Sequence, residues 1–291
     1  MLFCKKVVIL NRQAFKQKGP LLIVANHPDS FLDAILIGAH FTENVHFLAR
    51  GDAFKQKKHR ILLKMLKMIP VYRLSEGREN LPLNDYAFTE SKRILESGGI
   101  VLIFIEGICL NSHELQPFKK GAARIAYNIK KEIRLKLLPI AITYSSFQKY
   151  GKRVRLAAGS TLPALNLFPA EDLAKNYLFF NSRIQKELEQ LIQLPSSVPT
   201  PRYLWGKPLA RLGRILHYPY YWLISNRIRN KTNGTVFYDS VLFGVLLLTY
   251  PLYLLLLHGM IFFFTGSLLL VILMLLIHLI TARLAVLYTP E

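Results

Sequence analysis

Residues 21–33 read Leu-Leu-Ile-Val-Ala-Asn-His-Pro-Asp-Ser-Phe-Leu-Asp. The apolar start predicts a buried strand, and Ser30 opens a stretch typical of a helix start. His27 lies between the two, at the carboxyl edge of the predicted sheet, where α/β proteins usually build their sites. An imidazole held beside a carboxylate can take a proton from a hydroxyl. This stretch therefore predicts an α/β fold and an acid–base site together.

The partner of His27 is one of two aspartates. A carboxylate bonded to the other ring nitrogen would fix the tautomer of the imidazole and stabilise the imidazolium. We favour Asp33 for this role, and Asp29 is the other possibility. The simpler interpretation is a loop histidine, with Asp29 or Ser30 acting only as a helix N-cap.

Short aliphatic runs alternate with amphipathic stretches over the first 160 residues. This alternation predicts an α/β fold with a mixed sheet flanked by helices. The predicted strands cover residues 7–10, 21–25, 45–49, 69–73, 100–105, 135–143 and 154–157. The predicted helices cover residues 30–39, 53–68, 84–97, 121–131 and 171–193.

The proline-rich stretch 195–201 cannot continue a helix, so we place a domain boundary there. Three parts are expected. The α/β domain covers residues 1–194, a basic and aromatic interfacial linker covers residues 195–234, and a two-helix transmembrane hairpin covers residues 235–291.

The expected hairpin consists of two apolar segments, residues 236–257 and 261–280, joined by a tight turn at residues 258–260. At ~1.5 Å per residue the segments would span roughly 33 and 30 Å, enough to cross a bilayer. Basic residues flank both outer ends, whereas the turn has none, which predicts that both ends and the α/β domain face the cytoplasm. Asp239 is the single charge in these segments, and we interpret it as ordinary interfacial polarity.

The formal net charge of +20 suggests either nucleic acid or an anionic membrane as partner. Between residues 202 and 231, seven basic residues are interleaved with six aromatic ones, a combination that suits the headgroup layer of a membrane. No nucleic-acid-binding motif accompanies the charge, so we expect a membrane partner and no nucleic acid.

The cysteines and histidines show no metal-ligand spacing, so we expect no metal and no resident cofactor. Cys4 and Cys109 are each interpreted as packing thiols.

Further candidate residues follow other apolar runs. Arg73 ends a predicted strand and could form a bidentate bond to phosphate. Glu106 and Gly107 follow the strand at 100–105, where a bare backbone allows a ligand to approach closely. Lys119 and Lys120 precede a predicted helix start and could bind an anion there. The simpler interpretation of each charged residue is a solvated surface group.

These residues together resemble the glycerolipid acyltransferases. The resemblance rests on four ordered blocks: Asn26-His27 with a following Asp, the strand ending in Arg73, Phe104-x-Glu106-Gly107, and Leu138-Pro139-Ile140. They cover about residues 7 to 160, more than half of the chain.

The resemblance implies transfer of an acyl group from acyl-CoA or acyl-carrier protein to a glycerol hydroxyl in phospholipid synthesis. It implies that His27 is the general base and Asp33 its orienting carboxylate. It also implies that Arg73 binds the phosphate of the acceptor and that Glu106 and Gly107 help to form the acceptor pocket. We expect 1-acylglycerol-3-phosphate as the acceptor. The alternatives are glycerol-3-phosphate, or a non-catalytic membrane protein that binds anionic lipid.

The chain departs from the family pattern at three blocks. In the second block, the glycine that usually lies upstream of the arginine is missing. Five residues, 28–32, separate His27 from Asp33, where the family usually has four. In the third block, Ile105 replaces a proline, and Ile108-Cys109 stands where Thr-Arg is expected. Lys119 and Lys120 could compensate for the missing arginine.

Overall fold

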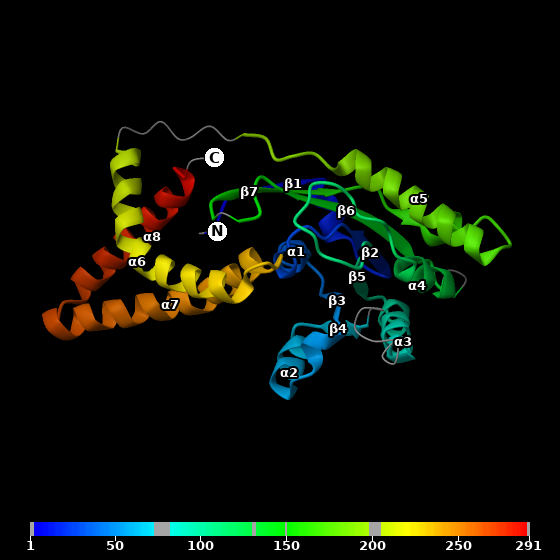
Figure 1. Ribbon diagram of the computed structural model, residues 1–291, viewed down its shortest axis with the longest axis horizontal. Coiled ribbons are helices and arrows are strands. Elements are labelled where there is room, and N and C mark those ends of the chain that lie inside the picture. The colour runs from blue at the N-terminus through cyan, green and yellow to red at the C-terminus, as the bar shows by residue number, and fades with distance from the viewer. Residues whose placement is uncertain (1–2, 73–81, 130–131, 149, 198–204, 290–291) are drawn as a thin grey trace.

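The computed structural model describes residues 3–72, 82–129, 132–148, 150–197 and 205–289 (Figure 1). Its strands are β1 (Cys4–Leu10), β2 (Leu21–Ala25), β3 (Val45–Arg50), β4 (Met68–Val71), β5 (Ile100–Phe104), β6 (Lys136–Tyr144), β7 (Lys152–Ala158) and β8 (Leu162–Pro163). Its α-helices are α1 (Phe31–Gly38), α2 (Lys57–Met65), α3 (Asn84–Glu96), α4 (Gly121–Ile129), α5 (Leu173–Leu191), α6 (Gly206–Thr232), α7 (Tyr238–Thr265) and α8 (Leu268–Leu287).

The strands form one mixed sheet of eight strands. Its order is β1-β7-β6-β2-β5-β3-β4, and β8 pairs with β6 beside this path. Neighbours along the path are parallel, except β6 and β7, which are antiparallel. The predicted mixed α/β sheet is confirmed. Because β2, β5, β3 and β4 run in one direction, the loops after them meet at one edge of the sheet.

The central strand β2 is buried on both faces. All five of its residues are fully inaccessible to solvent, as expected for a continuous apolar run in the middle of a parallel sheet. Leu21, Ile23 and Ala25 face a core that includes α1 and inward residues of α6 and α7. Leu22 and Val24 face the core under α3, α4 and α5. The carboxyl-terminal helices thus share the face of the sheet that α1 covers.

The predicted strands are all present, with ends shifted by at most a few residues in the described part of the chain. The predicted helix at 53–68 is shorter, because a 3₁₀ turn over Gly51–Phe54 precedes α2. Among the strands and α-helices of the described residues, the short β8 and the long α6 were not predicted. Helix α6 lies within the expected interfacial linker.

Helix α6 packs closely along α8. Its buried face carries the small residues Gly206, Ala210 and Gly213. A Cβ atom on Gly213 would lie 2.2 Å from the carbonyl oxygen of Thr281 on α8. Small side chains at this crossing therefore let the two backbones approach, as in helix pairs of membrane proteins.

Helices α7 and α8 are long and apolar enough to cross a membrane, with mean hydropathies of 2.2 and 2.5. Only 22% and 28% of their most apolar windows are buried inside the protein. In water, such a large exposed apolar surface would be unfavourable.

The predicted turn at residues 258–260 is wrong. Helix α7 continues through these residues to Thr265, and the chain turns at Gly266, which has a left-handed φ of 63°. Ser267 then caps α8 by accepting a hydrogen bond from the amide of Leu270. A left-handed glycine followed by a capping serine is a stronger stop signal than Gly259 inside an apolar run.

Candidate active site

His27 lies where β2 leaves the sheet, and Glu106 lies just beyond the end of the neighbouring strand β5. The register pairs Ala25 of β2 with Phe104 of β5, which brings the two loops together. Asn26 fixes the chain on the other side. Its side chain donates to the carbonyl oxygen of Ile142 at 3.0 Å and accepts from the amide of Ile142 at 2.8 Å. The exit of β2 is therefore tied to β6 just before His27.

The imidazole of His27 is paired with Asp33. Nδ1 of His27 lies 2.9 Å from Oδ2 of Asp33, whose side chain is fully buried in the first turn of α1. The other oxygen of Asp33 accepts a hydrogen bond from the hydroxyl of Tyr144 at 2.7 Å, and the amide of Asp29 donates to Oδ2 at 2.8 Å. The ring of His27 also stacks on Phe104, with centroids 3.8 Å apart. Both the carboxylate and the imidazole are thereby held in one orientation.

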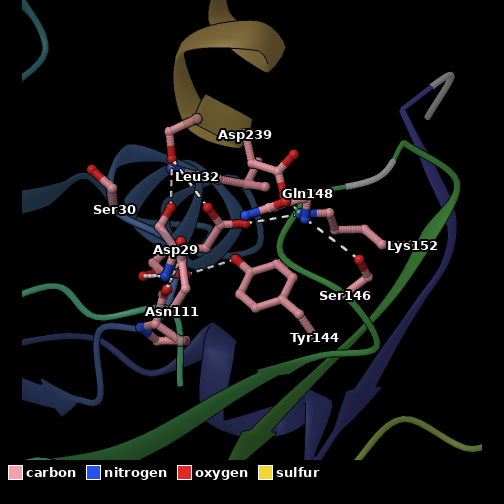
Figure 2. A network of polar contacts seen from close by, with 12 residues as sticks. Asp29, Ser30, Leu32, Asn111, Tyr144, Ser146, Gln148, Lys152 and Asp239 are labelled. Carbon is pink, nitrogen blue, oxygen red and sulfur yellow. Dashed lines mark hydrogen bonds and ion pairs between the residues drawn. The ribbon is translucent and has the colours of Figure 1, made fainter. Parts of the chain in front are cut away.

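Asp29 does not contact the imidazole with its carboxylate. Its Oδ2 atom lies 3.0 Å from Nζ of Lys152, which also contacts Asp239 (Figure 2). Of the two aspartates left open by the sequence, the structure thus places Asp33 beside His27. The interpretation of Asp239 as interfacial polarity is wrong, because this carboxylate is 1% exposed and ion-paired with a lysine of the sheet.

Glu106 supports the loop that carries His27. Its carboxylate accepts hydrogen bonds from the amides of His27, at 3.0 Å, and Gln116, at 3.1 Å. The side chain is buried, and burial raises the pKa of its carboxyl group. Glu106 therefore holds two loops together rather than facing the open cleft described below.

Gly107 allows the side chain of Lys119 to pass close to its backbone. It adopts a left-handed φ of 64°, and a Cβ atom there would lie 2.8 Å from Cγ of Lys119. A side chain at this position would therefore be strained and would displace the lysine. Lys119 and Lys120 come directly before the first residue of α4. The free amides of the first turn and the positive end of the helix dipole lie at this same end of the helix.

A cleft of about 1330 Å³ opens beside His27. Much of its wall is apolar, including Phe31, Phe47, Leu63, Met68, Val71 and Phe88. Gly107, Lys119 and Lys120 also line it, so three of the residues expected from the sequence lie on the same cleft as His27. The first residue before α7, Phe237, contributes to the wall and brings the apolar carboxyl-terminal helices to the edge of the cleft.

Arg124 is a cleft residue that was not predicted from the sequence. It lines the wall, and its guanidinium lies 4.5 Å from the ring centroid of Phe88. Its signal in the sequence was its position four residues after Lys120, on the same side of a helix. Tyr144 was also missed, because only the pairing of β6 with β2 brings it near Asp33.

Two other expectations concern Arg73 and Cys109. Arg73 lies outside the described residues, so its expected phosphate contact stays a prediction. Cys109 accepts a hydrogen bond from the amide of Ser30 at 3.0 Å, and burial raises the pKa of its thiol far above the usual range. A thiol in this state is a poor nucleophile, which agrees with its interpretation as a packing residue.

Across the described residues, no group of three or more His, Cys, Asp and Glu side chains has the geometry to hold a metal ion.

A family model described as Acyltransferase matches residues 6–143, from β1 through nearly all of β6. A probable 1-acyl-sn-glycerol-3-phosphate acyltransferase from Mycoplasma genitalium is 28% identical over 144 residues, which cover 48% of this chain and 50% of that protein. A protein of the same description from Mycoplasma pneumoniae is 32% identical over 127 residues, covering 42% of this chain and 45% of that protein. Over these residues the chain is similar to the glycerolipid acyltransferases. It spans about half the length of these curated relatives.

The chain is also similar to a solved structure, that of the 1-acyl-sn-glycerophosphate acyltransferase from Thermotoga maritima. The sequence identity is 18% and the TM-score is 0.45, over 65% of this chain and 73% of that one.

Proposed function

We propose that this acyltransferase transfers an acyl group from a thioester, acyl-CoA or acyl-carrier protein, to the hydroxyl of 1-acylglycerol-3-phosphate. The observation that carries the proposal is the His27–Asp33 pair on the wall of an apolar cleft that also bears Lys119 and Lys120. An apolar cleft suits an acyl chain, and the two ammonium groups suit a phosphate. The names of the two Mycoplasma relatives support this choice of acceptor.

In the proposed reaction, His27 is the general base. Because Nδ1 is paired with Asp33, Nε2 is the ring nitrogen that faces the substrate. Nε2 takes the proton of the acceptor hydroxyl as its oxygen attacks the thioester carbonyl. The tetrahedral intermediate then expels the thiolate, which receives this proton from the imidazolium, so an ester and a thiol are formed. Asp33 stabilises the imidazolium between these two steps.

The acceptor phosphate is proposed to bind at the start of α4. Lys119 and Lys120 supply positive charge, and the free amides at a helix start favour an anion. Arg124 on the same wall offers a planar donor group. Arg73 is proposed as a further phosphate ligand on the grounds of the family resemblance.

Helices α7 and α8 are proposed to cross the membrane, with both outer ends and the α/β domain on the cytoplasmic side. The large exposed apolar area of both helices and the absence of Lys and Arg near their turn support this arrangement. An amphipathic acceptor could then reach the cleft laterally, past Phe237.

The test is acyl transfer by the detergent-purified full chain. Labelled acyl-CoA or acyl-carrier protein is offered with 1-acylglycerol-3-phosphate or with glycerol-3-phosphate. Phosphatidate formed from 1-acylglycerol-3-phosphate is the expected result. Turnover of glycerol-3-phosphate alone would replace the proposed acceptor with the alternative one. Turnover of neither, with either donor, would contradict the proposal and favour a non-catalytic lipid-binding protein.

A further inference from the structure

The loop between His27 and Asp33 is held by residues that lie far from it in the sequence. Asp29 points its carboxylate at Lys152 of β7, at 3.0 Å, and Lys152 also contacts the carboxylate of Asp239 at the start of α7 (Figure 2). The exposed fractions of Asp29, Lys152 and Asp239 are 0%, 2% and 1%. We call these three residues the buried triad. It joins a catalytic loop, a strand and an apolar helix that are far apart in the sequence.

Ser240, the neighbour of Asp239, holds the backbone of the same loop. Its hydroxyl donates to the carbonyl oxygen of Asp29 at 2.5 Å and accepts from the amide of Leu32 at 3.2 Å. These two backbone groups lie on either side of Ser30. One side chain of α7 therefore bridges the loop across the residue at its bend.

The bend at Ser30 needs such support. Ser30 has a φ of 51° and a ψ of −131°, a conformation that residues with a Cβ atom rarely adopt. Its amide is held by the sulfur of Cys109, and Asn111 donates to the carbonyl oxygen of Pro28 at 2.8 Å. A strained backbone conformation persists only when several surrounding contacts hold it in place. Here Ser240 of α7 supplies some of these contacts.

We propose that Lys152, Asp239 and Ser240 are positioning residues that set the geometry of His27 and Asp33, so that α7 is part of the catalytic unit as well as a membrane segment. The inference rests on the proposed role of His27. If α7 served only as a membrane anchor, it would need no buried charges at its amino-terminal end, because an apolar contact at the same place would usually be at least as stable. Two of the contacts of Ser240 go to the backbone between His27 and Asp33, so a displacement of this backbone would move both side chains.

The test compares Ser240→Ala with Ser225→Ala in the full chain. Ser225 is also a buried serine in the carboxyl-terminal helices, but its hydroxyl bonds only to a carbonyl of its own helix, that of Trp222. We expect Ser240→Ala to lower kcat by about 10- to 100-fold with the KM for donor and acceptor unchanged, because small misplacements of reacting groups have effects of this size. Ser225→Ala should retain the wild-type kcat.

A second pair of variants keeps the test decisive if Ser240→Ala does not fold. Asp239→Asn removes the charge facing Lys152, and Asp239→Glu restores it on a longer side chain. We expect Asp239→Asn to lose more kcat than Asp239→Glu. The comparison requires that the two variants have equal thermal unfolding midpoints, so that both are equally folded at the assay temperature. Equal kcat in both, or a change in KM instead of kcat, would overturn the inference.

His27→Ala, assayed in parallel, separates the inference from the proposed function. Wild-type turnover by His27→Ala would contradict the proposed role of His27, on which the inference rests. An inactive His27→Ala together with a fully active Ser240→Ala would overturn only the positioning role.

Discussion

Tyr144 and Asp33 are joined by a hydrogen bond of 2.7 Å between the end of β6 and the first turn of α1. The tyrosine is fully buried, and burial together with the nearby carboxylates raises its pKa well above the usual value. Tyr144 therefore keeps its proton and always acts as the donor. The oxygen of Asp33 that does not face His27 is satisfied in this way, which holds the other oxygen toward the ring.

Tyr144→Phe should lower kcat by about tenfold and leave both KM values unchanged. The variant keeps the ring but removes a hydrogen bond to a charged group, an interaction of about 1.5–3 kcal/mol. Steady-state kinetics measure the effect, with the exposed Tyr86→Phe as the control. An unchanged kcat would show that the hydroxyl does not orient Asp33.

Asp33→Asn should reduce kcat far more than Asp29→Asn. Replacing the carboxylate partner of a catalytic histidine disturbs its tautomer and has lowered rates by about 10⁴-fold in a comparable triad. Asp29→Asn leaves the pairing of His27 with Asp33 intact, so we expect a loss of about tenfold or less. Rate measurements on both variants check the ranking, and the reverse order would mean that Asp29 is the functional partner.

The double substitution of Lys119 and Lys120 by Ala should raise the KM for a phosphorylated acceptor by about tenfold, equivalent to about 1.4 kcal/mol of binding. The KM for the acyl donor should not change. Lys175→Ala, on α5, is the matched control, and Arg73→Ala is expected to act like the double variant. If only the KM for the acyl donor changed, these basic residues would be assigned to binding the CoA or acyl-carrier protein part of the donor instead.

Asp29 should make stability depend on pH. Burial is the main reason why its pKa is raised from 3.8 to about 8; Asp33 and Asp239 raise it further, and Lys152 opposes them. Between these two pKa values the folded protein holds a proton that the unfolded chain releases, so stability falls as the pH rises through this window. The difference in thermal unfolding midpoint between the wild type and Asp29→Asn should therefore shrink or reverse from pH 5 to pH 8.

The expected change is at least a few degrees, since 1 kcal/mol corresponds to roughly 2–4 °C in proteins of ~150–250 residues. Ser225→Ala should follow the wild type at both pH values. An equal difference between wild type and Asp29→Asn at pH 5 and pH 8 would mean that Asp29 is ionised throughout.

The strands β2 and β5 could be predicted nearly to the residue, because continuous apolar runs end there at a polar group. The closeness of His27 and Asp33 was also predictable, since a strand end followed by the first turn of a helix brings them together. Both predictions depend on neighbours in the sequence.

The buried triad could not be predicted in this way. Lys152 is 123 residues from Asp29 and 87 residues from Asp239, so only the packing of α7 against the sheet brings them together. Asp239 precedes a long apolar run, and composition does not distinguish a charge at a membrane interface from one buried under a sheet. The turn at Gly266 was missed for a similar reason, because the residues on both sides of 258–260 are uniformly apolar.

The most direct test of the central claim is the single-turnover rate of acyl transfer to 1-acylglycerol-3-phosphate by His27→Ala, compared with wild type at equal substrate occupancy. If His27 takes the proton of the acceptor hydroxyl, the variant should be slower by about 10²–10⁴-fold, the usual contribution of a general base, while still binding both substrates. A rate within a few-fold of wild type would show that His27 is not the base.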